Sequence, residues 1–140
     1  MAKNLQAERI KGNFDSEQKA SQAEVNAGTD TDKFVTAETL AGNPRLGSQL
    51  AIAALDLDWA LATHFYKTLD ASSIFTFSNL ADAKTIIVAI TNTAGNFTVT
   101  WPTVSWTGGA APTQTIGVKT DVYTFVRING VVYGSVIQDY

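Results

Sequence analysis

Few residues of this chain have both the side-chain type and the spacing that catalysis or metal binding requires. In ALDLDW, residues 54–59, Asp56 and Asp58 alternate with apolar residues, so a strand here places both carboxylates on one face, about 7 Å apart. Two carboxylates at such a distance flank the scissile bond in glycoside hydrolases. Same-face acids on an exposed strand are usually a solvated face or an edge guard. We therefore expect no catalysis from this pair.

Metal and nucleophile chemistry has still less support. His64 is the only histidine and there is no cysteine, so no thiolate-bound zinc and no nucleophile–base pair can be assembled from these residues. The DTDK stretch at 30–33 starts like a calcium loop but lacks its fifth-position ligand and sixth-position glycine. NFT at 96–98 matches a glycosylation acceptor without an export signal. We predict that the protein is not an enzyme and has no metal or cofactor.

Charge and hydropathy exclude two classes of partner. The 140 residues carry a net charge of -3, whereas nucleic-acid binding needs clustered Lys and Arg. No apolar run approaches the ~20 residues of a membrane span, and the first residues have no signal-peptide core. We expect neither nucleic acid nor a membrane as partner, and no export.

The composition changes near residue 50. The first 50 residues hold 13 of the 23 charged residues but only two of the 14 aromatics, Phe14 and Phe34. Such a segment buries too little to offset backbone ordering, which costs about 1–2 kcal/mol per residue. The sequence predicts an N-terminal attachment arm and linker over 1–49, ordered by a partner, and a folded domain over 50–140. The apolar residues expected to contact that partner are Leu5, Ile10 and Phe14.

The arm is expected to be mostly extended, with two short helices. Asp15 is predicted to cap the first, which ends at Gly28. The second is predicted to run from a Thr36 cap through AETLA to Gly42, before a turn at NPRLG. The alternative is a plain surface linker.

Beyond residue 50, seven short runs have strand character. They cover 54–59, 64–69, 73–77, 84–91, 97–101, 121–128 and 131–138. Asn129-Gly130, between the last two, is the strongest hairpin signal, because a type I′ turn needs two residues that tolerate positive φ. The spacing predicts a mainly β domain, an antiparallel β-sandwich or small jelly-roll-like fold.

The aromatic stretch NFTVTWPTVSWTGG, residues 96–109, has one strand face of Phe97, Val99 and Trp101. We expect this face in the core and the strand to end at Pro102. Trp106 is expected in the loop that follows, either packing or available to a ligand or neighbouring chain. The residues predicted to contact a ligand or an interface are Trp106, Tyr123 and Tyr133.

Two stretches resemble proteins of known type. ASQAEVNAGTDTDKFVTAETLAG, residues 20–42, resembles a short repeat of tailed-bacteriophage fibre proteins, with Ala37 where proline is usual. The positions that match are Glu24, Val25, Ala27, Gly28, Thr29, Asp30, Lys33, Val35, Thr36 and Leu40. Residues 65–102 and 108–140 resemble C-terminal β domains of phage virion fibres and related bacterial adhesive fibres.

The resemblance implies a virion structural protein, a homotrimer that provides no catalytic residue. We expect a short head or tail fibre, or a decoration protein, that docks on capsid, collar or tail through its arm and projects a β knob. At about 3.3 Å per extended residue, an arm of this length makes a stub. The alternative is a receptor-binding module for a host-surface glycan.

Overall fold

The computed structural model of the chain describes residues 19–27, 33, 35–41 and 49–140. It divides into two units, Met1–Leu46 and Gly47–Tyr140, each considered by itself. The predicted attachment residues Leu5, Ile10 and Phe14 lie outside the described residues.

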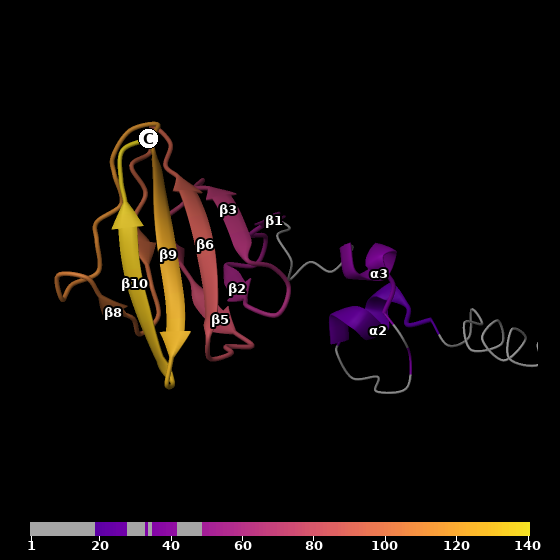
Figure 1. The fold of residues 1–140 in the computed structure, drawn as a ribbon. Coiled ribbons are helices and arrows are strands. Elements are labelled where there is room, and N and C mark those ends of the chain that lie inside the picture. The colour runs from indigo at the N-terminus through magenta and orange to yellow at the C-terminus, as the bar shows by residue number, and fades with distance from the viewer. Residues whose placement is uncertain (1–18, 28–32, 34, 42–48) are drawn as a thin grey trace, which may run out of the picture. The chain divides into compact units, whose positions relative to one another are not determined.

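The described part of the N-terminal unit contains two short helices, α2 over Gln22–Ala27 and α3 over Ala37–Ala41 (Figure 1). Helix α3 covers the predicted AETLA segment. Its cap is Thr36, whose hydroxyl accepts a hydrogen bond from the Thr39 backbone N–H at 3.3 Å, while the Thr39 hydroxyl accepts one from the Thr36 N–H at 3.0 Å. The predicted Thr36 cap and AETLA helix are confirmed, whereas the predicted end at Gly42 and the turn at NPRLG lie outside the described residues.

The prediction for the first helix is wrong at its start. Residues 19–21 are not helical, and α2 begins at Gln22. Ser21 and Glu24 form a reciprocal capping box there: the Glu24 carboxylate accepts from the Ser21 N–H at 2.7 Å, and the Ser21 hydroxyl accepts from the Glu24 N–H at 3.3 Å. The Ser-x-x-Glu spacing is the sequence signal for this start. The proposed cap at Asp15 and the proposed end at Gly28 lie outside the described residues.

The second unit is built of strands, and the chain as a whole is mainly β. The strands are β1 Gln49–Ala51, β2 Asp56–Asp58, β3 His64–Thr68, β4 Ser73–Ile74, β5 Thr76–Ser78, β6 Lys84–Thr91, β7 Val99–Thr100, β8 Ser105–Trp106, β9 Thr120–Ile128 and β10 Val131–Ile137. Every predicted run contains strand residues, and the run over 73–77 is split at Phe75. Strands β1 and β8 were not predicted.

The strands form one large sheet and two small ones. The large sheet has the order β1-β3-β6-β9-β10-β8, and the small sheets pair β2 with β5 and β4 with β7. Of the seven strand pairings among the described residues, five are parallel, and only β6–β9 and β9–β10 are antiparallel. The expectation of an antiparallel fold is therefore wrong for most of the pairings.

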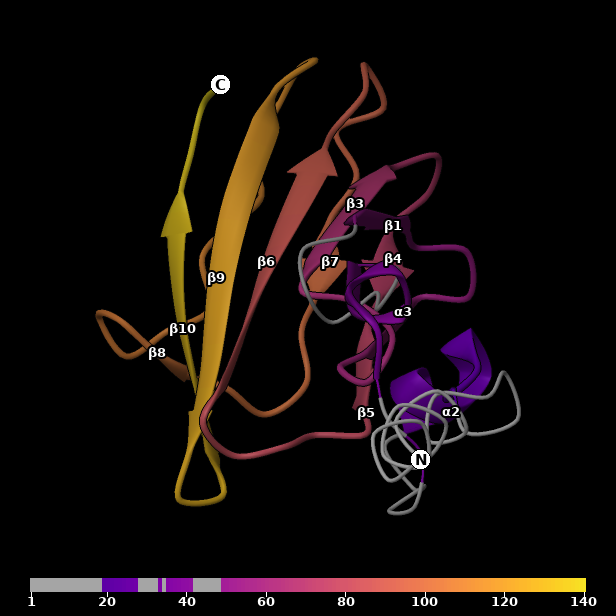
Figure 2. The ribbon, with the colours of Figure 1, turned by 45° about the vertical axis from the view of Figure 1, so that its right-hand side comes forward.

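The order of the strands along the chain explains the parallel pairing. After β1 the chain passes through β2 before it returns to the large sheet as β3, and after β3 it passes through β4 and β5 before it returns as β6 (Figure 2). A return of this kind is a crossover connection, which brings neighbouring strands into the sheet in the same direction. Strands β9 and β10 are instead joined directly by Asn129-Gly130, whose φ angles of 50° and 78° fit the predicted type I′ turn.

The core lies between side chains of the large sheet and side chains on or beside the small-sheet strands. Trp101 joins the two sets: its ring centroid lies 5.0 Å from that of Phe75, 4.6 Å from Tyr123 and 5.0 Å from Phe125. Phe97 and Val99 pack against the same cluster, while Thr98 and Thr100 are exposed. The core assignment of Phe97, Val99 and Trp101 is confirmed.

We predict that Trp101→Ala lowers the free energy of unfolding by about 3–5 kcal/mol, because it removes the ring that contacts both sets of core side chains. Trp101→Phe keeps an aromatic ring and is expected to lose less. Chemical denaturation followed by circular dichroism measures both losses. A loss below about 1 kcal/mol for the alanine variant would contradict this account of the core.

Candidate functional site

The three aromatic residues predicted to contact a ligand do not form one surface. Tyr123 is wholly buried, and its hydroxyl donates a hydrogen bond to Gln114 Oε1 at 2.9 Å. Burial raises the pKa of the Tyr123 hydroxyl, and the charge of Asp121 raises it further. The prediction that Tyr123 is available to a ligand or an interface is wrong, because this alternating strand turns it toward the core.

Trp106 belongs to the edge strand β8, not to a loop. Strand β8 pairs in parallel with β10, and Trp106 lies opposite Gly134. The partly buried indole packs against the core, 5.5 Å between ring centroids from Phe125. A Cβ on Gly134 would lie 2.8 Å from the Trp106 ring, so only glycine fits there. A glycine inside a strand run signals such close approach, and Gly134 is that signal in VVYGSVI.

Tyr133 is the one residue of the three that is exposed on a regular surface. We call this surface the outer face: the positions of β3, β6, β9 and β10 that alternate with the core positions. Strand registers place Tyr133 opposite Val126, which on its other side lies opposite Thr85. Ile137 lies opposite Val122, which on its other side lies opposite Ala89. The outer face comprises His64, Tyr66, Thr68, Thr85, Ile87, Ala89, Thr91, Thr120, Val122, Thr124, Val126, Ile128, Val131, Tyr133, Ser135 and Ile137.

The outer face contains no Asp, Glu, Lys or Arg. The charged residues of the same four strands occupy the alternate positions: Lys67 lies opposite Ile90, Lys84 opposite Arg127, and Asp121 opposite Ile90. The face is instead aliphatic, threonine-rich and partly aromatic, and its exposed large apolar side chains are Tyr66, Ile128, Val131, Tyr133 and Ile137. Figure 1 shows its four strands side by side. A hollow of about 210 Å³ lies beside Tyr133 and Thr124.

The acids that suggested sugar chemistry serve the fold. Asp56 accepts hydrogen bonds from Thr76 Oγ1 at 2.7 Å and from Ser78 Oγ at 2.5 Å, across the β2–β5 pair. Asp58 accepts from the Ala60 backbone N–H at 2.8 Å and from Asn79 Nδ2 at 2.9 Å. Each carboxylate is therefore tied to a neighbouring segment by two donors, the pattern of a structural acid.

Asp121 is a buried acid that the sequence did not single out. It is fully buried and accepts hydrogen bonds from the backbone N–H and hydroxyl of Thr115, each at 2.7 Å. Gln138 Nε2 and the Asp139 backbone N–H donate to the same carboxylate at 3.2 Å. These four donors stabilise the buried charge, and the bonds hold the loop before β9 to the segment after β10.

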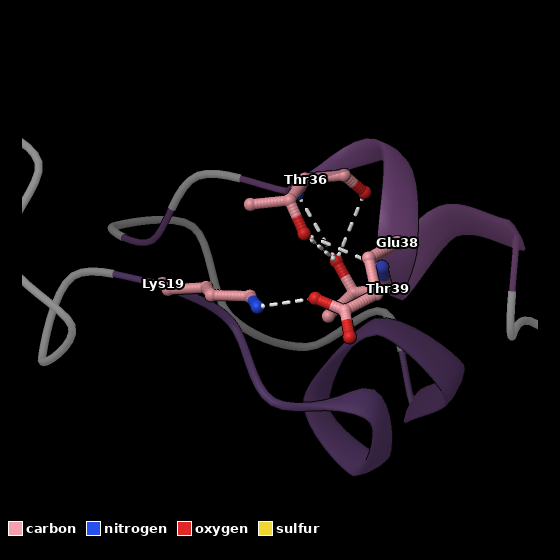
Figure 3. A network of polar contacts seen from close by, with 4 residues as sticks. All are labelled: Lys19, Thr36, Glu38 and Thr39. Atoms are coloured by element: carbon pink, nitrogen blue, oxygen red, sulfur yellow. Dashed lines mark hydrogen bonds and ion pairs between the residues drawn. The ribbon is translucent and has the colours of Figure 1, made fainter.

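In the N-terminal unit, charged side chains of the described residues contact one another. Glu24 caps α2 and also forms an ion pair with Lys33, with 2.5 Å between Lys33 Nζ and Glu24 Oε1. Lys19 Nζ lies 2.9 Å from Glu38 Oε2 and links the start of the described chain to α3 (Figure 3). The apolar positions Val35 and Leu40 are 50% and 48% exposed. The described residues of this unit thus include polar side chains that contact one another and aliphatic side chains that face solvent.

Two kinds of site are not found in the part of the chain that the structure describes. It holds no group of three or more His, Cys, Asp or Glu side chains placed to bind a metal ion. None of the described helices is long and apolar enough to cross a membrane.

Comparison with known proteins finds no family model that matches this chain. No curated protein and no solved structure matches it either.

The Glu24 contacts lead to a pH prediction. The hydrogen bond from Lys33, followed by those from Ser21, lowers the Glu24 pKa from 4.5 to about 2. A carboxyl whose pKa falls on folding contributes stability above its unfolded pKa and loses it as pH falls through the folded value. We expect the helix pair to keep this contribution above pH 4.5 and to lose it as pH approaches 2.

An NMR titration of the Glu24 side-chain carboxyl measures this pKa directly. Lys33→Gln is expected to raise it toward 4.5. Lys19→Gln is the matched control, because Lys19 lowers the pKa of Glu38 instead. A wild-type Glu24 pKa near 4.5 would show that the contacts with Lys33 and Ser21 do not persist in solution.

Proposed function

We propose that this chain is a non-enzymatic structural protein of a tailed-bacteriophage virion: a short trimeric head or tail fibre, or a decoration protein. In this proposal the N-terminal unit docks on capsid, collar or tail. The β unit projects as a two-layer, sandwich-like knob, and the protein resides in the virion after synthesis in the host cytoplasm. The observation that carries the proposal is that, among the described residues of the 20–42 stretch that resembles a phage-fibre repeat, Glu24, Lys33 and Thr36 make the contacts of a small folded element.

The exposed residues of this helix pair support a docking role. Its described buried side chains are only Ala20 and Thr39, and its ion pairs Lys19–Glu38 and Lys33–Glu24 are open to solvent screening, which weakens them. An element with so little internal burial gains stability when a partner covers its aliphatic side chains. Val35 and Leu40 are the side chains available for such a contact.

The acids of the β unit support a structural role over catalysis. Asp56 and Asp58 are engaged with β5, the following turn and Asn79, and Asp121 is enclosed by four donors. His64 is exposed on the outer face, with Thr63 Oγ1 3.0 Å from its Nδ1. Asp56 and Asp58 line one shallow hollow with mostly apolar residues, but each carboxylate is already bonded to two donors, and neither His64 nor Asp121 lines that hollow.

The rival proposal, binding of a host-surface glycan, has less support. It relied on Trp106, Tyr123 and Tyr133 as a sugar-binding platform. Tyr123 is buried, Trp106 packs inward and Tyr133 points outward. A stacking platform needs aromatic rings on one accessible surface, and these three residues do not share one.

We predict that a chain lacking residues 1–46 keeps the β fold but no longer binds particles assembled without this protein. The core cluster lies entirely beyond that boundary. Circular dichroism with a thermal melt tests the fold, and co-sedimentation with the particles tests docking. An unfolded truncated chain would show that the first unit is needed for the β core, and undiminished co-sedimentation would contradict its docking role.

A point substitution separates docking from folding. Leu40→Ser removes an exposed aliphatic side chain of α3 and is expected to weaken co-sedimentation at least tenfold. Ala37→Ser, at another exposed position of the same helix, is the matched control and should bind as the wild type does. Equal binding by both variants would exclude Leu40 from the docking surface.

A further inference from the structure

We propose that the outer face of the large sheet is the surface through which copies of this chain associate. The first support is its chemistry. A sheet face open to water normally alternates polar, often charged, residues with the core positions. Here the outward positions of four neighbouring strands carry no charge, and five large apolar side chains on them are 43–61% exposed. Contiguous exposed patches of this kind mark interaction surfaces.

The absence of charge is specific to this face. Beyond residue 50 the chain carries Asp56, Asp58, Lys67, Asp70, Asp82, Lys84, Lys119, Asp121, Arg127 and Asp139, and none of them lies at an outward position. Four of these residues belong to the strands of the outer face but occupy the opposite side. Charged side chains are depleted at the centre of protein interfaces, which is the distribution found here.

The composition of the face favours a second copy as its occupant. A surface without charged side chains cannot form ion pairs with a charged partner. The hydroxyl groups of Thr85, Thr124 and Ser135 can both donate and accept hydrogen bonds, so they can pair with the same groups of a second copy. Such a surface is chemically complementary to itself. Four strands about 4.8 Å apart and about 25 Å long give roughly 500 Å² of flat area. Because side chains project from the sheet, the accessible area of the face is larger than this flat area and approaches the roughly 800 Å² per partner of a stable interface.

The edges of the large sheet are less suited to association. Strand β1 has three residues and β8 has two, and such short edge strands give an incoming strand few backbone partners. Copies of the chain are therefore expected to pack face to face. The hollow beside Tyr133 and Thr124 is a place on the face where a side chain of a neighbouring copy fits.

Thr124→Arg tests the proposal, because it places a charge between Ile87 and Ser135 at the middle of the face. Thr100→Arg is the matched control: it makes the same change at an exposed strand position outside the face. Light scattering on the full chain should give about three times the 15.0 kDa chain mass for the wild type and the control. The Thr124→Arg variant should give 15.0 kDa with an unchanged circular dichroism spectrum.

A second measurement uses the unmodified chain and does not depend on a variant that folds. Hydroxyl-radical labelling of Tyr66 and Tyr133, which are 46% and 45% exposed in the single chain, should fall several-fold when the protein is concentrated from nanomolar to micromolar. Ile74, which is 68% exposed and belongs to the small-sheet strand β4 outside the face, is the internal reference and should keep its labelling. Labelling of Tyr66 and Tyr133 that stays as constant as that of Ile74 at both concentrations, in a sample shown to associate, would overturn the proposal.

The inference rests on the proposed function only in taking the protein as a homo-oligomer. A wild-type monomer at micromolar concentration, or a folded Thr124→Arg variant that stays associated, would overturn the assignment of the face. Association through this face as a dimer would contradict the trimer and leave the face in place. Loss of particle binding by the Leu40→Ser variant tests only the docking role of the N-terminal unit, because this substitution does not change the outer face.

Discussion

The β unit depends on the contact of one indole with rings from both sets of core side chains. Trp101 follows β7, on the small-sheet side, and its ring lies close to Tyr123 and Phe125 of β9 in the large sheet. Phe75, between β4 and β5, stacks on the same indole at a centroid distance of 5.0 Å. Aromatic rings bury large areas and add pairwise contact energy. This cluster fixes how the small-sheet strands sit against the large sheet.

Alternation along the strands then connects the core to the outer face. Because Tyr123 and Phe125 point inward, Val122, Thr124 and Val126 must point outward. The positions of β6 and β9 that point inward also include Asp121, Lys84 and Arg127, whose polar groups form hydrogen bonds near the ends of the sheet. Asp121 is held by Thr115 and the C-terminal segment, and Arg127 Nη1 donates to the Leu80 carbonyl at 2.8 Å. The charge of these strands therefore lies on the core side and leaves the opposite face neutral, the reverse of an ordinary exposed sheet.

The N-terminal unit follows a different physical principle. Its described helices have six and five residues, too short to be stable alone in water. Reciprocal caps at Ser21–Glu24 and Thr36–Thr39 satisfy backbone groups at the helix starts, and ion pairs link the segments. Such contacts specify a conformation but bury little apolar area. The two units thus differ in what stabilises them, which is consistent with a proposed division between docking and projection.

The sequence by itself determined the strand segments, because alternation in stretches such as KTIIVAIT and DVYTFVRI is a local pattern, and it determined the hairpin at Asn129-Gly130 and the helix after Thr36. Only the tertiary structure decided which strands pair and in which direction, because pairing joins segments far apart in the chain, as β1 with β3 and β8 with β10. It also decided that Tyr123 is buried and Tyr133 exposed. Alternation within one strand does not tell which of its two faces meets the core; contacts with other strands do.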